Sequence, residues 1–452
     1  MKYISEQYAE FVQEMHYERL DPETIYQVKK LVLDLTGVSL AGYKLMEFPR
    51  MVVDYMASLG GIPEATMIQQ KGKFPAINVV LANAVCAHAI DMDDGHRYGA
   101  LHPGTVVIPA AIVAAELSKT TTKAMISGIV AGYEVMIRIG MAITPSSLNR
   151  GFHITGITGT YGAAAAVANI MNLNREQTMA ALGLAGLQSS GLIQVNHEKE
   201  GAKVKPINPG KAAMSGLLSC IMASKGFSGP KEIFEGEDGF LKAVADGVNK
   251  ESFTANIGKN LEINNVYLKL YSACRHAHAP IDAVLEIKKR EGIEPDEIKE
   301  ITVETYPVAV RLAGMTKVTS PSAGRFSIPF SVALALIKND AGATQYTEEN
   351  IEDRQIQDLA GKVRLLESDK WGQVYPHKRG ATVRIISNDG KELSTEIDLA
   401  KGEPENPASW EEIYKKFYTN ARLLLSEENV VKLGDTIMDL ENQPIQAVVD
   451  LL

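Results

Sequence analysis

The sequence predicts a mainly α-helical protein in which a large all-helical domain carries an inserted, smaller α/β (α+β) domain. Helical periodicity runs through the first part of the 452-residue chain, strand-like alternation follows about residue 267, and helical periodicity returns near residue 400. A chain of this length is also too long for one simple core. We therefore expect residues 1–267 and 400–452 to form a discontinuous helical domain around residues 268–399.

The helical part has a clear start signal at Asp21-Pro22, an N-cap residue followed by a proline in the first turn. Apolar residues then recur on one helical face: Val28, Leu31, Val32, Leu35 and Val38. Further along, Ala124, Gly128 and Gly132 lie four residues apart, which lets a second helix approach closely. These patterns predict a tightly packed helical domain.

The inserted part carries strand signals. Residues 299–306 alternate between apolar and polar positions. Residues 382–386 and 393–399 alternate in the same way on either side of an Asn-Asp-Gly turn at residues 388–390, the strongest hairpin signal in the chain. The breaker-rich residues 401–407 then mark a boundary, after which helical periodicity resumes.

Composition excludes several classes of function. The formal net charge of −9 means that the surface as a whole repels phosphate backbones and anionic lipid, so we expect neither nucleic acid nor membrane as a partner. The longest apolar runs are shorter than the roughly 20 residues of a membrane-spanning helix. Cys86, Cys220 and Cys274 are far apart and in no CxxC spacing, which argues against a disulfide framework or a zinc cage. With no signal-peptide pattern at the N-terminus, we expect a cytoplasmic protein.

Six of the nine histidines fall in three short segments that also hold other ionisable residues, a clustering that indicates a functional site. The first segment is AHAIDMDDGHRYGALHPG, whose polar residues are His88, Asp91, Asp93, Asp94, His96, Arg97 and His102. Its glycines predict an exposed loop between two buried helices, with the second helix starting near Pro103. Each aspartate alone is also compatible with a helix cap or a turn.

Two more segments carry isolated cationic or titratable groups. NRGFHITG places His153 between glycines, where a buried structural histidine is the alternative interpretation. GAKVKPINPGKAA carries Lys203, Lys205 and Lys211 but lacks residues that a phosphate-binding loop requires. These lysines suggest a clamp for carboxylates, with a solvated charge run as the alternative.

The last segment, KLYSACRHAHAPIDA, lies where the helical domain is expected to give way to the α/β domain, and such junctions are preferred places for small-molecule sites. Its polar residues include Lys269, Cys274, Arg275, His276, His278 and Asp282. One cysteine near two histidines is weak support for covalent catalysis, so we interpret Cys274 as structural or substrate-lining. Aspartate and histidine can bind metal ions, but neither a calcium-loop pattern nor HExxH occurs, and we expect no metal.

Taken together, these segments resemble the MmgE/PrpD family over nearly the full chain. The resemblance rests on six fragments in order: AHAIDMDDGHRYGALHPGTVVIPAAIVAAE, RGFHITGITGTYGAAAA, VKPINPGKAA, KLYSACRHAHAPIDA, GRFSIPFSVALAL and KGEPENPASWEEIYKKF. Known members include 2-methylcitrate dehydratase, cis-aconitate decarboxylase and iminodisuccinate epimerase. The resemblance implies a helical domain with an inserted α/β lid, a homodimer, and no obligatory metal or other cofactor.

By analogy with the decarboxylase members, the resemblance implies a set of catalytic positions: Asp91, His102, His153, Lys205 and Lys269. This chain departs from many relatives at Gly95, where they have a threonine, and at Phe330, which replaces a tyrosine. The DDGHRYGALHPG loop is also one residue longer than that of the decarboxylase, which would place His96 or Arg97 in the pocket.

The family reactions all develop negative charge on a carbon next to a carboxylate, so they share a need for cationic groups and a positioned proton carrier. We expect Lys205 and Lys269 to hold carboxylates of a small polycarboxylate, while His102 and His153 move protons and Asp91 orients a histidine. The further candidates for substrate binding are His96, Arg97, Cys274, Arg275 and His276.

The expected activity is that of a cofactor-independent lyase most similar to 2-methylcitrate dehydratase, which makes the fewest special demands on the site. An epimerase acting on iminodisuccinate would need proton carriers on opposite faces of the substrate. A cis-aconitate decarboxylase would need only a proton donor after carbon dioxide leaves. A non-catalytic polycarboxylate binder is the remaining alternative, although a binder has little need for the two histidines.

Overall fold

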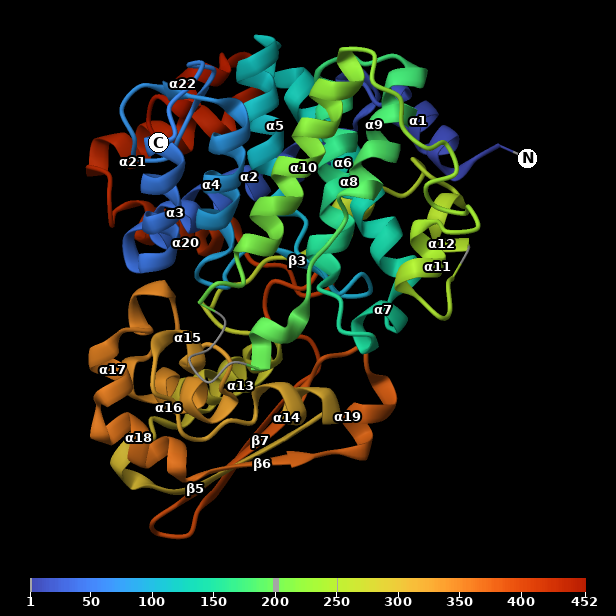
Figure 1. The fold of residues 1–452 in the computed structure, drawn as a ribbon. Helices are drawn as coiled ribbons and strands as arrows, with labels where there is room; N and C mark the ends of the chain where they lie inside the picture. The colour runs from blue at the N-terminus through green and yellow to red at the C-terminus, as the bar shows by residue number, and fades with distance from the viewer. Residues whose placement is uncertain (1, 198–202, 250) are drawn as a thin grey trace.

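The computed structural model describes residues 2–197, 203–249 and 251–452, and the chain is mainly α-helical, as predicted (Figure 1). The first part contains α1 (Ile4–Glu14), α2 (Pro22–Leu45), α3 (Glu47–Ser58), α4 (Ala76–His88), α5 (Gly104–Ser118), α6 (Thr122–Ile143), α7 (Ser146–Asn149), α8 (Ile154–Ile170), α9 (Arg175–Leu187), α10 (Ile207–Ser224), α11 (Phe240–Val244) and α12 (Glu251–Thr254). Two short antiparallel pairs accompany them: β1 (Ala65–Thr66) with β2 (Lys73–Phe74), and β3 (Gly95–His96) with β4 (Val266–Tyr267).

The next part combines helices with a sheet. Its elements are α13 (His278–Glu291), β5 (Ile298–Thr305), α14 (Pro307–Ala313), α15 (Pro321–Gly324), α16 (Ile328–Lys338), α17 (Glu348–Glu352), α18 (Arg354–Gly361), β6 (Val363–Glu367), α19 (Asp369–Val374), β7 (Ala381–Ser387) and β8 (Glu392–Ile397). The strand order is β6-β5-β7-β8, with β5 and β6 parallel and the other pairs antiparallel. Figure 1 shows α13, α14 and α16 between this sheet and the helical part of the molecule.

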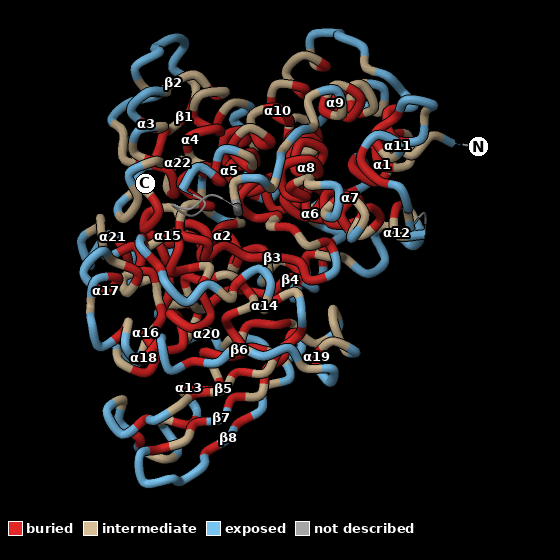
Figure 2. Tube along the Cα trace, turned by 60° about the horizontal axis from the view of Figure 1, so that its bottom comes forward, coloured by how far each residue is buried: buried red, intermediate tan, exposed pale blue. Residues whose placement is uncertain are grey.

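The chain then returns to the first part through α20 (Trp410–Ala421), α21 (Glu427–Met438) and α22 (Ile445–Val449). Side chains of these helices belong to the same hydrophobic core as those of α1 to α10, whereas residues between Ala273 and Ala400 form a second core. Figure 2 shows buried segments in both parts of the molecule. We call the elements around these two cores the helical unit and the second unit. That the second unit acts as a lid stays a prediction, because packing alone does not report movement.

The helix cap and the hairpin turn predicted from the sequence are both present in the structure. Asp21 accepts a hydrogen bond from the backbone N–H of Thr24 and caps α2, and the turn at residues 388–390 joins β7 to β8. The small residues of α6 also allow a close approach, because a Cβ on Gly132 would lie 2.8 Å from the carbonyl oxygen of Gly162 in α8. The prediction of a tightly packed helical pair is confirmed.

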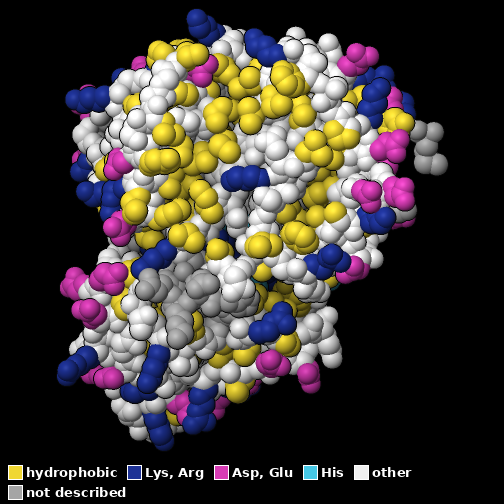
Figure 3. Space-filling model, in the orientation of Figure 1, with side chains coloured by type: hydrophobic (Ala, Val, Ile, Leu, Met, Phe, Trp, Pro, Cys, Tyr) yellow, Lys and Arg dark blue, Asp and Glu magenta, His cyan; other side chains and the backbone are white. Residues whose placement is uncertain are grey.

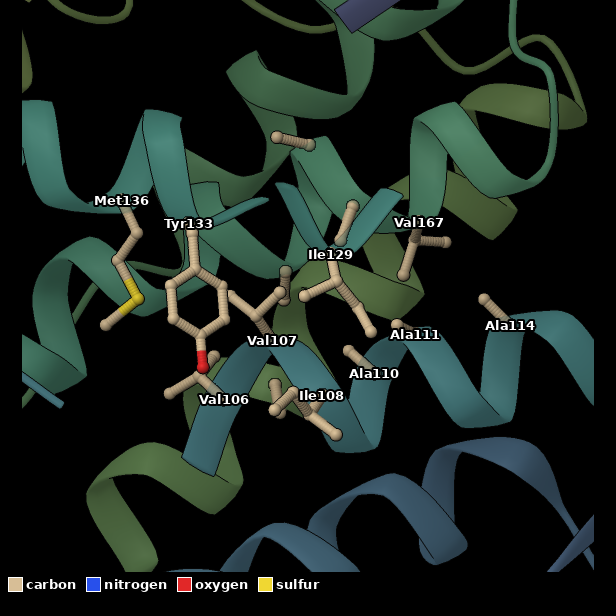
Figure 4. Close-up of a cluster of buried hydrophobic side chains, with 14 of the residues drawn as sticks. Val106, Val107, Ile108, Ala110, Ala111, Ala114, Ile129, Tyr133, Met136 and Val167 are labelled. Atoms are coloured by element: carbon tan, nitrogen blue, oxygen red, sulfur yellow. The ribbon is translucent and has the colours of Figure 1, made fainter. Parts of the chain in front are cut away.

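Helix α5 lies against α6 and α8 at the centre of the helical unit (Figure 4). Val106, Val107 and Ile108 of α5 and Ile129 of α6 are fully or almost fully buried there. Helix α6 is long and apolar enough to cross a membrane, but 94% of its most apolar stretch is buried inside the molecule, as in a core helix. This core fixes the ends of α4, α5 and α8, from which the candidate site is built.

Candidate active site

Most of the loop between α4 and α5 is buried, so the expectation of an exposed loop is wrong for all but Tyr98. Every side chain of residues 91–97 is buried. The reason lies far along the chain: Gly95 and His96 pair with β4, and Arg97 is covered by residues of the 401–407 loop. The polar side chains of this loop are therefore held by specific partners instead of water.

Asp91 lies at the centre of a buried ion cluster. Asp91 follows the end of α4 and has a φ of 50°. Aspartate adopts this left-handed backbone conformation more readily than most residues do. One carboxylate oxygen lies 3.0 Å from Nζ of Lys205 and the other 3.0 Å from Nζ of Lys269. Burial alone would raise the pKa of Asp91, but the two lysines outweigh it and hold that pKa well below its usual range.

Three imidazole rings gather beside this cluster. The ring centroid of His88 lies 5.1 Å from that of His102 and 6.2 Å from that of His153. Asp93 accepts a hydrogen bond from Nδ1 of His88 at 2.8 Å, and its carboxylate lies 3.6 Å from Nδ1 of His102. Among the described residues, Nε2 of His88, Oδ1 of Asp93 and Nδ1 of His153 have no hydrogen-bond partner, so polar atoms remain open to a ligand.

The imidazoles of His102 and His153 are neutral at physiological pH. Burial lowers the pKa of His102 to about 3, although the charge of Asp93 opposes this shift. Burial, together with the positive charge of Lys205, holds the pKa of His153 well below its usual range. Nδ1 of His102 lies 2.7 Å from the backbone oxygen of Asp94, which can only accept, so the proton of the neutral ring is on Nδ1. Nε2 of His102 is then an unprotonated base.

Asp94 links the loop between α4 and α5 to helices α5 and α6. It accepts hydrogen bonds from the backbone N–H of Gly104 at 3.0 Å and from the hydroxyl of Tyr133 at 2.9 Å. Burial and the neighbouring charge of Asp93 raise the pKa of Asp94 to about 8. Asp94 is therefore mostly protonated at neutral pH and positions the loop without adding charge to the site.

The structure also brings together donors that could hold a metal ion. One ligand atom from each of His88, Asp93 and His102 lies within 4.8 Å of the other two. Nδ1 of His88 is hydrogen-bonded to Asp93, and Nδ1 of His102 is hydrogen-bonded to the backbone oxygen of Asp94. The expectation that no metal is required stays a prediction.

Three predicted substrate-binding residues have protein partners elsewhere. Nη1 and Nη2 of Arg97 pair with Glu403 and Glu405, and Arg275 donates to Glu403 at 3.0 and 3.1 Å. Nδ1 of His96 accepts the backbone N–H of Gly99, and its Nε2 lies 3.3 Å from Glu262. These contacts tie the 401–407 loop to both units and give no support to a clamp for substrate.

The two other predicted contacts lie close to the ion cluster. The charges of Asp91 and Lys269 both act on the thiol of Cys274, whose pKa is raised mainly by burial. Nδ1 of His276 lies 2.6 Å from the hydroxyl of Tyr306, and burial lowers the pKa of His276 to about 3. A raised thiol pKa does not favour a thiolate nucleophile, in agreement with a structural or substrate-lining Cys274.

The two departures from the family pattern have structural partners. A Cβ on Gly95 would clash with the ring and hydroxyl of Tyr267, so a side chain is excluded there while Tyr267 occupies the space. Phe330 is fully buried in the second core, with its ring centroid 6.2 Å from that of Tyr346. Phe330 therefore contributes to the hydrophobic core of the second unit.

A small cavity joins the ion cluster to the second unit. His88, Ala89, Asp91, Lys205 and Pro206 line it from the helical unit, and Ser322, Arg325 and Phe326 line it from the second unit. It measures about 10 Å³, which is room for about one water molecule.

Sequence reasoning left His88 and Arg325 out of the site. His88 stands in the first polar segment but lies in an apolar helix, and Arg325 is enclosed by apolar residues of the GRFSIPF fragment. The signal available for both was a titratable or charged residue in an apolar stretch.

Comparison with known proteins extends over almost the whole chain. The MmgE/PrpD N-terminal domain family matches residues 6–252, and the MmgE/PrpD C-terminal domain family matches residues 271–440. Cis-aconitate decarboxylase of Aspergillus terreus is 28% identical over 393 residues, which cover 82% of this chain and 79% of that protein. Human cis-aconitate decarboxylase is 24% identical over 464 residues, 98% of this chain and 93% of that protein. Mitochondrial 2-methylcitrate dehydratase of Yarrowia lipolytica is 25% identical over 340 residues, 73% of this chain and 65% of that protein.

Proposed function

Because the chain belongs to the MmgE/PrpD family, we propose that this lyase acts on a small polycarboxylate, by removing carbon dioxide from a substrate of the cis-aconitate type. Decarboxylases and dehydratases are both lyases, and both occur among the relatives named above. The decarboxylases match a larger share of this chain than the dehydratase does. For this reason we propose decarboxylation as the first candidate reaction, in place of the dehydration that the sequence alone favoured.

The observation that carries the proposal is an excess of positive charge in a buried site. Lys205, Lys269 and Arg325 provide three positive charges, while Asp91 and Asp93 provide two negative charges. All five side chains are buried, so the remaining positive charge is poorly screened by solvent. An anionic substrate would complete the charge balance.

The neutral histidines supply the second requirement, which is a proton carrier. Loss of carbon dioxide leaves an electron pair on the carbon chain of the substrate, and a proton must then form the new carbon–hydrogen bond. A bound polycarboxylate would add negative charge beside His102 and raise its pKa, so that this ring could take up a proton and deliver it. The two lysine ammonium groups would meanwhile stabilise the developing negative charge.

Dehydration is the second candidate, because the site contains more than one titratable ring. Removal of water needs one base for the proton next to a carboxylate and one acid for the departing hydroxyl. One of His102 and His153 could serve as the base and the other as the acid, since both lie beside His88 and precede different helices, α5 and α8. The Yarrowia lipolytica dehydratase among the relatives supports the same alternative.

A cavity of about 10 Å³ cannot hold a polycarboxylate, so we also propose that the second unit acts as a lid that moves away to admit substrate. Movement of the second unit would separate Arg325 and Phe326 from Asp91 and Lys205. Small-angle scattering tests the idea, because the radius of gyration should fall when an unreactive polycarboxylate such as tricarballylate binds. An unchanged radius of gyration in a sample that demonstrably binds tricarballylate would contradict the proposal that the second unit acts as a lid.

We further propose that two copies of the chain associate through the helical unit. Apolar side chains spread across the helical half of the face in Figure 3, where charged side chains lie mainly at the edges. Exposed apolar residues of the helical unit include Met51, Tyr55 and Leu187. Light scattering should give the mass of a dimer, and Tyr55→Asp should shift it towards the monomer. A monomer at micromolar concentration would contradict the proposal.

Turnover in D₂O followed by NMR tests the proposed reaction. The enzyme is incubated with cis-aconitate, 2-methylcitrate, citrate and iminodisuccinate. Decarboxylation would give carbon dioxide and an unsaturated dicarboxylate that carries one deuterium. Loss of water from 2-methylcitrate would favour dehydration, and deuterium exchange without net loss of iminodisuccinate would favour epimerisation. Tight binding without turnover would support a binder, and no reaction or binding with any compound would overturn the proposal.

A further inference from the structure

We propose that Arg325, at the end of α15 in the second unit, binds one carboxylate of the substrate and so determines that polycarboxylates are preferred. This inference rests on the proposed function, because it names a further contact of the same site. Arg325 is only 2% exposed and lines the cavity together with Asp91 and Lys205. A buried guanidinium at this position needs a partner for its charge.

The contacts of Arg325 leave part of the guanidinium open. Nε donates to the hydroxyl of Ser272 at 3.0 Å, and Nη1 lies 3.6 Å from the sulfur of Met46. Nη2 is buried and has no hydrogen-bond partner among the described residues. No carboxylate of the described chain lies within 4.0 Å of this guanidinium, in contrast to Arg97, Arg275 and Arg138.

The surroundings of Arg325 hold it in place without neutralising it. Its guanidinium carbon lies 5.4 Å from the ring centroid of Tyr346, a cation–π distance. The Ser272 hydroxyl that accepts from Arg325 donates in turn to the backbone oxygen of Ile90 at 2.6 Å. Because Ile90 directly precedes Asp91, this chain of hydrogen bonds aligns the guanidinium with the ion cluster.

A carboxylate is the ligand that fits this arrangement best. Guanidinium groups bind carboxylates through two parallel hydrogen bonds, and such charge-assisted bonds are strong when buried. Lys205 of the helical unit lines the same cavity, and its Nζ lies 5.3 Å from the ring centroid of Phe326. A substrate with carboxylates at two ends would therefore bridge the two units, whereas a monocarboxylate could satisfy only one of them.

Calorimetric titration with tricarballylate tests this inference, because the ligand carries three carboxylates and has no double bond to react. Arg325→Gln should weaken binding on the order of 10²-fold, since it leaves one carboxylate without its buried partner. Arg325→Lys keeps the positive charge but cannot form two parallel hydrogen bonds to a carboxylate. Its affinity for tricarballylate should lie between that of the wild type and that of Arg325→Gln. The matched control is Arg364→Gln, which removes a 69%-exposed arginine of the same unit and should bind as the wild type does.

A second ligand separates a direct contact from an effect on folding. Butyrate carries a single carboxylate, which Lys205 or Lys269 can hold without Arg325, so Arg325→Lys should bind it almost as well as the wild type does. An equal loss for both ligands would indicate a structural role and overturn the inference. Ser272→Ala removes the positioning hydrogen bond while the guanidinium remains, so it should weaken tricarballylate binding less than Arg325→Gln does.

The outcomes also separate this inference from the proposed function. Arg325 variants that weaken tricarballylate binding, in an enzyme that turns over none of the tested substrates, would support the inference and contradict the activity. Variants that bind tricarballylate like the wild type, in an enzyme that decarboxylates cis-aconitate, would overturn the inference alone. A wild-type enzyme that does not bind tricarballylate would also overturn it.

Discussion

Nδ1 of His88 lies 2.8 Å from a carboxylate oxygen of Asp93, and both side chains are fully buried. His88 also lines the cavity between the two units. The carboxylate accepts the proton of Nδ1, which leaves Nε2 of His88 as the ring atom without a hydrogen-bond partner among the described residues. A carboxylate paired with one ring nitrogen fixes the tautomer and the orientation of the imidazole. His88 therefore belongs with His102 and His153 as a candidate proton carrier.

Replacement of His88 should lower turnover more than it lowers substrate affinity. We expect His88→Gln to reduce kcat by about 10² to 10⁴-fold, the usual contribution of a positioned acid or base. Asp93→Asn should have a smaller effect, because the amide oxygen can still accept from the ring. Steady-state kinetics checks this, with His377→Gln as the control at an exposed position. A His88→Gln enzyme with unchanged kcat would remove His88 from the mechanism.

His102 should stay neutral when the pH falls through the range in which free histidine takes up its proton. Its pKa of about 3 lies below the usual 6.5, so lowering the pH from about 7 to about 5 should leave the ring unprotonated. Nitrogen-15 NMR of labelled histidine can follow this, with His102→Gln to assign the signal. The proton should be on Nδ1, which faces the backbone oxygen of Asp94. Titration near pH 6.5 in the empty enzyme would contradict the description of the site.

Asp94 should make the protein less stable as the pH rises. Its pKa is raised to about 8 in the folded state from an ordinary value of 3.8, so the folded protein holds a proton that the unfolded chain releases. The contribution of Asp94 to stability is therefore fully present below about pH 4 and is lost as the pH rises to about 8, by up to about 1.4 kcal/mol per pH unit.

Urea unfolding of the wild type and Asp94→Asn at several pH values isolates this effect, since every other titrating group is shared. The amide of the variant cannot ionise and can still accept from the backbone N–H of Gly104. The free energy of unfolding of the wild type should fall relative to that of the variant between about pH 5 and pH 8. Parallel pH profiles for the two proteins would mean that Asp94 is already ionised in the fold.

Gly95 should not tolerate threonine, the residue that the family resemblance implies at this position. A Cβ at Gly95 meets the ring of Tyr267, which pairs with it across the β3–β4 ladder, so Gly95→Thr should lower Tm and activity. Tyr267→Ala should relieve part of this loss, with a coupling free energy of about 0.5 to 3 kcal/mol in a double-mutant cycle. Gly247→Thr is the control, because a Cβ there has no neighbour within 4 Å. Strictly additive effects would show that the two positions do not compete for space.

Short-range sequence signals predicted the helices and turns well, because their causes are local. The Asp21 cap needs only Thr24 three residues away, and the turn at residues 388–390 needs only its own backbone conformations. The grouping of Asp91, Lys205 and Lys269 was implied by the family resemblance. Their mutual ion pairs were not predicted, because Asp91 was expected to orient a histidine and the lysines to hold substrate.

The partners that residues find far along the chain could not be predicted from the sequence. Arg97 and Arg275 looked free to bind substrate, but Glu403 reaches both from a loop that the sequence marked only as a boundary. The first polar segment offered His96 as a candidate, and only the pairing of β3 with β4 turns this residue towards Glu262. Charge and spacing therefore predicted which segments form the site, whereas tertiary packing decided which of their side chains face the cavity.

A crystal structure of the enzyme with tricarballylate tests the central claim most directly, because that claim concerns where an anionic substrate binds. One carboxylate of the ligand should lie within hydrogen-bond distance of Lys205 or Lys269, and another should contact Arg325. The carbon chain should then lie beside Nε2 of His102. A ligand bound elsewhere on the molecule, while this cavity keeps its present closed form, would contradict the account.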